Sequence, residues 1–97
     1  MAITVLVKKL TDSAKLPHRA YPGDAACDIF SNECVEIKPH ERVQIPTGLC
    51  MEIPEGYGIF IWDKSGLSHK QGLKALGGVI DATYRGEIKV GMVNLGK

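Results

Sequence analysis

Residues 43–53, VQIPTGLCMEI, carry an apolar or threonine side chain at every second position. The residues between them are mostly polar or small, so an extended chain would have one apolar face and one mixed face. This alternation predicts a half-buried β-strand. Pro46 and Gly48 interrupt the run, and since proline cannot donate a ladder hydrogen bond, they indicate an edge position or a bulge.

Other short segments carry the same kind of signal. Residues 3–8 and 35–38 alternate more briefly, and residues 57–62, YGIFIW, are apolar on both faces, as in a central strand. A helical turn is expected only over SGLSHKQG, with Asp63 or Ser65 as its N-cap. Many short strands separated by Gly and Pro turns predict an all-β fold: a sandwich, jelly roll or barrel.

Composition restricts the classes of protein. A chain of 97 residues forms one domain with a modest core, so its stability is expected to depend on assembly or on further sequence. The net charge is 12 minus 11, or +1, with both signs interspersed, which predicts neither nucleic-acid nor membrane partners. No apolar run is long enough to span a bilayer. The N-terminal segment has its apolar part before its lysines, the reverse of a secretory signal, so we expect a cytoplasmic protein.

The sulfur and imidazole side chains show no metal-binding spacing. Cys27, Cys34 and Cys50 are odd in number and irregularly placed, which favours free thiols acting as small core residues. The three histidines are scattered, so zinc ligation is not expected.

Two segments carry polar residues suited to phosphate chemistry. Asp28 lies in YPGDAACDIFS, where a turn leads into a strand, and its carboxylate is suited to orient water around Mg²⁺ or simply to face solvent. In WDKSGLSHK, residues 62–70, the run Lys64, Ser65 and Gly66 offers charge, a hydroxyl and accessible backbone N–H groups. This run suits a phosphate cradle, and an ordinary capped turn fits it equally well.

Residues 77–90, GGVIDATYRGEIKV, form the richest segment. The glycine pair permits positive φ or close backbone approach. Asp81 follows Val79 and Ile80, whose side chains would partly dry its surroundings, so it is a candidate general base. Tyr84 stands at the bend, where its ring is suited to stack under a sugar or base. The alternative is that Asp81 is a turn residue and Tyr84 fills the core.

Taken in this order, the three segments resemble the trimeric dUTP diphosphatase (dUTPase) family. GDAACDIFS is similar to the family's first motif, WDKSGLSHK to its second and GGVIDATYRGEI to its third. The resemblance implies a jelly-roll fold, a homotrimer with shared active sites, and Mg²⁺-dependent hydrolysis of dUTP to dUMP and pyrophosphate. Residues 1–97 are then expected to form one dUTPase-like β domain that lacks the fourth and fifth motifs and the C-terminal strands.

The resemblance also implies roles for individual residues. Asp81 matches the acid that activates water at the α-phosphorus, Tyr84 the ring on the deoxyribose, and Asp28 the acid of the metal-water shell. The remaining matches are the phosphate contacts Lys64, Ser65 and Gly66, the uracil-reading positions Ala75, Gly78, Val79 and Ile80, and Lys89 near the substrate.

Two departures from the family keep other functions open. Asp63-Lys64 stands where the family usually has Pro-Arg, so the planar guanidinium fork is lost and a negative charge is added beside the phosphate segment. A non-catalytic relative that binds a nucleotide or a protein partner is one alternative. The related dCTP deaminases are another, although the strand IKVGMVNL lacks the catalytic glutamate that they carry there.

Overall fold

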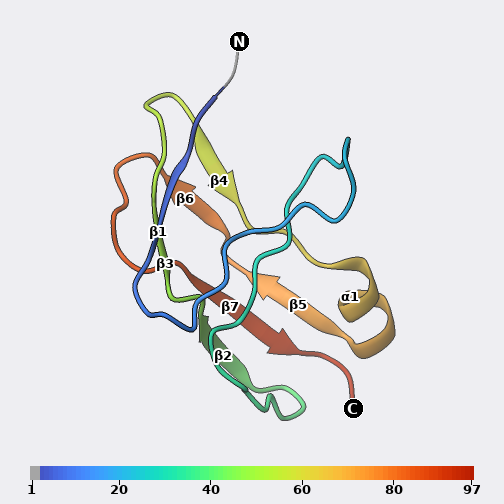
Figure 1. The fold of residues 1–97 in the computed structure, drawn as a ribbon. Coiled ribbons are helices and arrows are strands. Elements are labelled where there is room, and N and C mark those ends of the chain that lie inside the picture. The colour runs from blue at the N-terminus through green and yellow to red at the C-terminus, as the bar shows by residue number, and fades with distance from the viewer. Residues whose placement is uncertain (1–2) are drawn as a thin grey trace.

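The computed structural model describes residues 3–97, which form an all-β, jelly-roll-like fold with one short helix (Figure 1). Every strand pair is antiparallel, and the sheets are β1–β3, β2–β7–β5 and β4–β6. The all-β prediction is confirmed. The elements are β1 (Leu6–Lys9), β2 (Arg42–Pro46), β3 (Leu49–Glu52), β4 (Gly58–Phe60), α1 (Ser65–Gln71), β5 (Leu73–Leu76), β6 (Val79–Asp81) and β7 (Lys89–Asn94).

The alternating segment 43–53 is two strands rather than one. β2 ends at Pro46 on the edge of the three-stranded sheet, and β3 begins at Leu49 in the sheet with β1. The chain turns at Gly48, where φ is +71° and a Cβ atom would lie 2.8 Å from that of Ala14. The predicted edge position is therefore confirmed. The prediction of one continuous strand is wrong. Both β2 and β3 turn the apolar positions of the pattern inward, so the alternation continues although the chain changes sheet.

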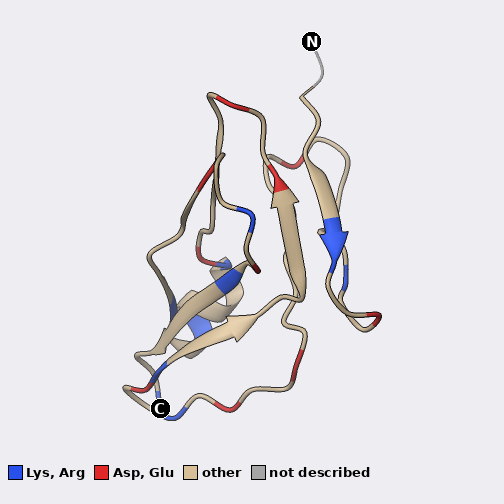
Figure 2. Cartoon of the chain, turned by 90° about the vertical axis from the view of Figure 1, so that its left-hand side faces the viewer, with Lys and Arg blue, Asp and Glu red and all other residues tan. Residues whose placement is uncertain are grey.

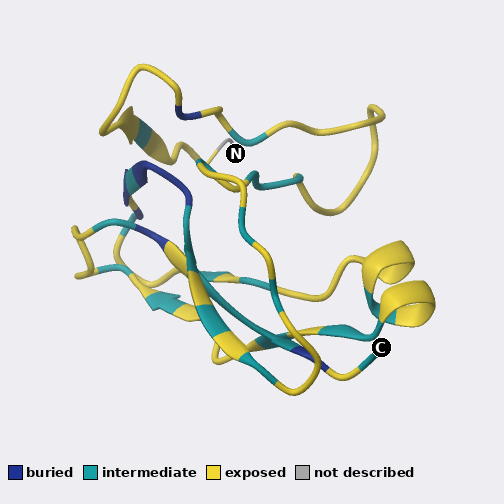
Figure 3. Cartoon of the chain, turned by 90° about the horizontal axis from the view of Figure 1, so that it is seen from below, coloured by how far each residue is buried: buried dark blue, intermediate teal, exposed yellow. Residues whose placement is uncertain are grey.

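The buried core is small and lies around β3. Its buried apolar members are Leu49, Met51 and Ile53 with Ala14 and Ile88. Figure 3 draws the buried segments of the chain in dark blue. Half-buried residues of other elements, among them Ile59 and Ile80, pack against these five. The expectation of a modest core is confirmed.

Thr47 connects the two halves of segment 43–53 inside this core. It is 1% exposed; its Oγ1 donates to the Ile88 carbonyl (2.6 Å) and accepts from the Leu49 N–H (3.2 Å). The hydroxyl therefore ties the start of β3 to the residue that precedes β7.

Replacing Thr47 by the nearly isosteric valine should lower the free energy of unfolding by about 2 kcal/mol, because the buried Leu49 N–H loses its acceptor. Thr47→Ser retains the hydroxyl and is the matched control, which should remain closer to the wild type. Urea denaturation monitored by circular dichroism measures both variants. A valine variant as stable as the wild type would show that this hydrogen bond contributes nothing.

Three strand predictions are corrected by the structure. β4 covers only three residues of YGIFIW, pairs within residues 3–97 with β6 alone, and leaves Phe60 60% and Trp62 84% exposed. It is therefore not a central strand. Residues 35–38 form no strand; the Ile37 carbonyl instead accepts a hydrogen bond from the Asn94 side chain (2.8 Å). The first strand begins at Leu6 rather than at Ile3.

The helix prediction is confirmed, but its cap is different. Lys64 is the N-cap, with extended backbone angles and no side-chain capping bond. The helix ends at Gly72, whose left-handed conformation lets its N–H reach the carbonyls of Leu67 and Ser68. α1 buries no residue.

The cysteines are free, but Cys27 and Cys34 are exposed and Cys50 is only half-buried, so their expected place in the core is wrong. Figure 2 shows acidic and basic residues interspersed over the fold, as their order in the chain predicts. Among residues 3–97, α1 is the sole helix, and it is too short and too polar to cross a bilayer.

Candidate active site

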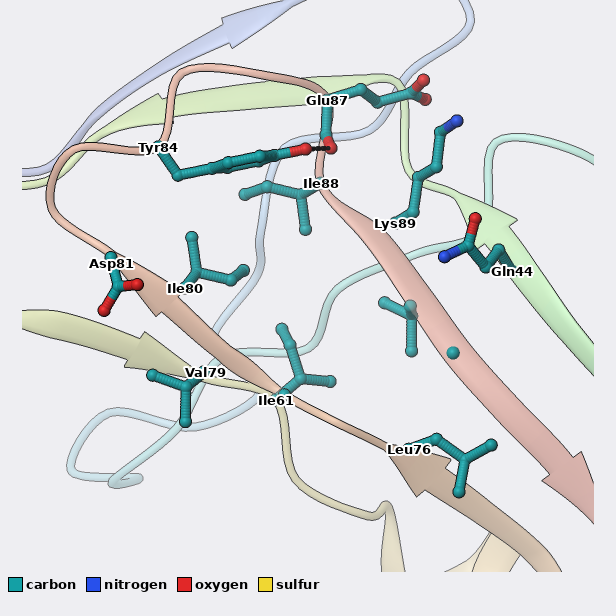
Figure 4. A pocket seen from close by; sticks show the side chains of 13 residues that line it. Gln44, Ile61, Leu76, Val79, Ile80, Asp81, Tyr84, Glu87, Ile88 and Lys89 are labelled. Carbon is teal, nitrogen blue, oxygen red and sulfur yellow. Dashed lines mark hydrogen bonds between the residues drawn. The ribbon is translucent and has the colours of Figure 1, made fainter.

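A pocket of about 520 Å³ lies where β6 separates from β7 (Figure 4). β5 and β7 pair as far as Leu76 and Gly91, after which the chain turns and β6 pairs with β4 instead. Within the described residues, the β6 edge that faces β7 has no strand partner. The predicted residues that line the pocket are Gly78, Val79, Ile80, Asp81, Tyr84 and Lys89.

The glycine pair redirects the chain from one sheet to the other. Gly77 has a φ of +71° and Gly78 a φ of +117°. A Cβ atom on Gly78 would lie 2.7 Å from the Ile61 carbonyl oxygen, and the Ile61 N–H donates to the Gly78 carbonyl (2.8 Å). The close approach is thus to the protein's own backbone. It sets the divergence of β6 from β7 and with it the pocket.

Tyr84 is held across one end of the pocket. Its hydroxyl donates to the Glu87 carbonyl (2.6 Å), and its N–H donates to the Asp81 carbonyl (3.0 Å). The ring passes over Gly86, where a Cβ atom would lie 2.7 Å from the hydroxyl oxygen. Tyr84 is 45% exposed, so it does not fill the core; it presents a fixed ring at the pocket instead (Figure 4).

Asp81 lies at the end of β6 and is exposed. Ile80 packs against the core, but Val79 is 65% exposed. The apolar surroundings expected from these two neighbours are therefore not supplied within a single chain, because only one of the two side chains is turned inward.

The first and second predicted segments meet at an ion pair. Lys64 Nζ donates to Asp28 Oδ1 (3.0 Å), and backbone hydrogen bonds between Asp28 and His18 anchor the loop. Ser65 and Gly66 form the exposed first turn of α1 beside it.

This ion pair stands outside the pocket, since neither Asp28 nor Lys64 is among the residues that line it. The structure thus brings the predicted site residues together as two separate groups.

Ala75 belongs to neither group. Its N–H donates to Asp63 Oδ1 (2.7 Å), and Lys74 Nζ donates to Asp63 Oδ2 (2.8 Å). The hydrogen bond from Lys74, then that from Ala75, holds the pKa of Asp63 below its usual value of 3.8. The negative charge that Asp63 adds to the phosphate segment is thus paired locally with Lys74.

The lowered pKa of Asp63 makes a pH-dependent contribution to stability. This contribution is fully present above the unfolded-state pKa of about 4 and disappears as the pH falls through the lowered folded-state value. Asp63→Asn should therefore be less stable than the wild type at neutral pH, with a gap that narrows below about pH 4. Thermal melts of both proteins across this range, with Glu52→Gln as a surface-charge control, measure the gap. A gap that stays constant with pH would contradict the assignment.

Within residues 3–97, no three His, Cys, Asp or Glu side chains gather closely enough to enclose a metal ion. Mg²⁺ commonly keeps several waters and binds through one or two carboxylates together with substrate phosphates. The part-exposed carboxylate of Asp28 fits that kind of water-mediated contact.

Two polar residues that line the pocket were missed in the sequence. Gln44 is on the polar side of β2, and Glu87 accepts a hydrogen bond from the Gly48 N–H (3.0 Å). Nothing in the pattern of β2 marks Gln44, since half of any edge strand is polar. Glu87 follows the Tyr-Arg-Gly turn, and that proximity to the bend was the available signal.

Among the described residues, the pocket thus combines a β6 edge without a strand partner, a fixed aromatic ring and a carboxylate. The particular family follows from comparison. The dUTPase family profile matches residues 12–97, and the chain belongs to that family.

Known relatives agree with this assignment. Deoxyuridine 5'-triphosphate nucleotidohydrolase of Streptomyces avermitilis is 42% identical over 95 residues, which cover 96% of this chain and 54% of the relative. That of Hydrogenobaculum sp. is 47% identical over 94 residues, with coverage of 94% and 65%. The chain thus spans little more than half to about two thirds of the length of these curated relatives.

Solved structures share the fold. Staphylococcus bacteriophage 80alpha dUTPase with dUPNHPP superposes with a TM-score of 0.91 at 38% identity, covering 97% of this chain and 56% of that one. The dUTPase of phage phi11 of S. aureus, in a mutant that shows the coordination of a structural Mg(II) ion, has a TM-score of 0.91 at 37% identity, covering 97% and 61%.

Proposed function

We propose that the protein hydrolyses dUTP to dUMP and pyrophosphate. The observation that carries the proposal is the pocket between β6 and β7, which has Asp81 and Tyr84 at one end in a chain of the dUTPase family. Each part of dUTP finds a matching group on the described residues.

The base is read by backbone groups at the diverging strands. The β6 edge at Val79 and Ile80 offers N–H donors to uracil O4 and C=O acceptors to N3–H. Cytosine reverses both polarities and would leave buried groups unmatched. Tyr84, fixed by its bond to the Glu87 carbonyl, packs on the deoxyribose and excludes a 2′-hydroxyl.

The reaction needs a nucleophile in line with the α-phosphorus and neutralised phosphate oxygens. The nucleophile is a water molecule, and Asp81 takes a proton from it. Lys64, Ser65 and Gly66 contact the phosphates, and Lys89 on β7 adds positive charge beside the pocket. When bound, Mg²⁺ supplies neutralisation of the phosphate oxygens, and Asp28 would hold its water shell.

The active protein is proposed to be a homotrimer with shared sites. Within one chain, Lys64 lies outside the pocket that Asp81 lines, and a second copy is proposed to bring the phosphate-contacting residues to it. Exposed apolar side chains on β4, β6 and the segment after β4, among them Phe60, Trp62 and Val79, offer a surface for such assembly. Two exposed free cysteines, Cys27 and Cys34, favour a reducing compartment, and we propose the cytoplasm.

Magnesium-dependent pyrophosphate release from dUTP tests the proposal, with dCTP, dTTP and UTP assayed alongside. We expect release from dUTP alone. Ammonia release from dCTP would indicate deamination instead, although β7 carries no acidic residue. Binding of dUPNHPP without turnover of dUTP would identify a non-catalytic relative.

A further inference from the structure

We propose that Asp63 is a positioning residue that clamps the phosphate-contacting segment 64–66 onto β5. The inference rests on the proposed function. It concerns the position where this chain has an acid in place of the family's usual proline.

The clamp uses both oxygens of one carboxylate. Oδ1 accepts from the Ala75 N–H (2.7 Å), and Oδ2 accepts from Lys74 Nζ (2.8 Å). One edge of β5 pairs with β7, and its opposite edge has no strand partner among the described residues. The Ala75 N–H lies on that outer edge and donates to Asp63 instead of to a neighbouring strand. Two adjacent residues of β5 thereby hold the residue that immediately precedes Lys64.

Little else secures this segment. α1 buries no side chain, and its N-cap Lys64 makes no side-chain capping bond. Before the clamp, the Ile61 N–H is tied to the Gly78 carbonyl (2.8 Å); after it, Lys64 is paired with Asp28 (3.0 Å). The Lys64 contact must be loosened if its ammonium turns to a phosphate. Among the described residues, Asp63 then makes the remaining side-chain hydrogen bonds that anchor the segment.

A positioning role affects one part of the substrate selectively. Segment 64–66 is proposed to meet the phosphates, while the base pocket is built from β6, β7 and Tyr84. Loosening the clamp should therefore weaken binding of a triphosphate and leave binding of dUMP nearly unchanged. Loss of fold would weaken both ligands alike.

The experiment compares Asp63→Ala, Asp63→Asn and Lys74→Met with the wild type, and uses Glu52→Ala as the matched control. Glu52 is also an exposed acid near a basic partner, 3.8 Å from Arg85, but it lies outside both groups of site residues. Calorimetry measures affinities for dUPNHPP and dUMP, steady-state kinetics measures KM and kcat for dUTP, and hydrogen exchange follows the Ala75 amide.

For Asp63→Ala we expect a roughly 10- to 100-fold loss of dUPNHPP affinity, a matching rise in KM and faster exchange of the Ala75 amide, with dUMP affinity kept within about twofold. Asp63→Asn and Lys74→Met each leave one of the two contacts and should show smaller losses. Glu52→Ala should behave as the wild type does.

Equal loss of dUPNHPP and dUMP binding, or no loss of either, would overturn the positioning role. If Asp63→Ala fails to fold, the same comparison is decided on Asp63→Asn and Lys74→Met. A wild type that binds neither ligand would overturn the proposed function, and the positioning role with it. If hydrogen exchange of the Ala75 amide is unchanged in Asp63→Ala, the hydrogen bond between Asp63 and Ala75 does not hold the segment, and the positioning role is overturned while the proposed function stands.

Discussion

Replacing Asp81 by asparagine is expected to lower kcat for dUTP by a factor of about 10² to 10⁴, because the amide cannot accept the proton of the attacking water. Affinity for dUPNHPP should change little. The turn at residues 81–84 is held by the backbone bond from the Tyr84 N–H to the Asp81 carbonyl, which asparagine retains. A pyrophosphate-release assay combined with calorimetry separates the two effects.

Asp12→Asn is the control for this substitution, since Asp12 is an exposed acid outside both groups of site residues. It should leave kcat unchanged. An Asp81→Asn variant that kept most of its activity would return Asp81 to the role of a turn residue, and the general base would have to be sought elsewhere.

Gly78→Ala is expected to destabilise the fold by about 3 kcal/mol, since it combines backbone strain at a φ of +117° with a clash against the Ile61 carbonyl. Gly77→Ala is the matched control one residue earlier. Its φ of +71° is also unfavourable for alanine, but no atom lies within 4 Å of the added Cβ, so about 1 kcal/mol is expected.

The two glycine variants also separate stability from pocket geometry. Relief of the Gly78 clash requires β6 to move away from Ile61, which would shift the edge proposed to read uracil. Urea denaturation gives the stabilities, and calorimetry with dUMP reports on the pocket. Equal effects of the two substitutions on both quantities would show that the Ile61 contact does not hold the pocket open.

The all-β class of this fold was readable from local patterns, but the assignment of strands to sheets was not. The apolar or threonine positions of segment 43–53 alternate on both sides of Pro46 and Gly48, yet the chain changes sheet at Thr47-Gly48. The reason is that a period of two reports which side of a strand is buried and carries no information about its neighbours. The prediction of a central strand over YGIFIW failed for a related reason. Apolar side chains on both faces suit a surface for assembly as well as the centre of a sheet.

The candidate site depended on motif order more than on pattern. The local pattern around Asp81 and Tyr84 is equally compatible with Asp81 as a turn residue and Tyr84 as a core residue. Their position after a glycine pair, in a chain with two earlier segments that resemble the family's motifs, favoured an active site instead. The partners of Asp63 were not predictable. Its side chain is an N-cap candidate by local rules, and Lys74 and Ala75 compete for it from a strand that only the folded chain brings near.

The central claim is that a water activated by Asp81 attacks the α-phosphorus of dUTP. It is tested most directly by hydrolysis in water labelled with heavy oxygen, followed by mass spectrometry of both products. Attack at the α-phosphorus predicts label in dUMP and none in pyrophosphate. Label in pyrophosphate would place the attack on the β-phosphorus and contradict the claim.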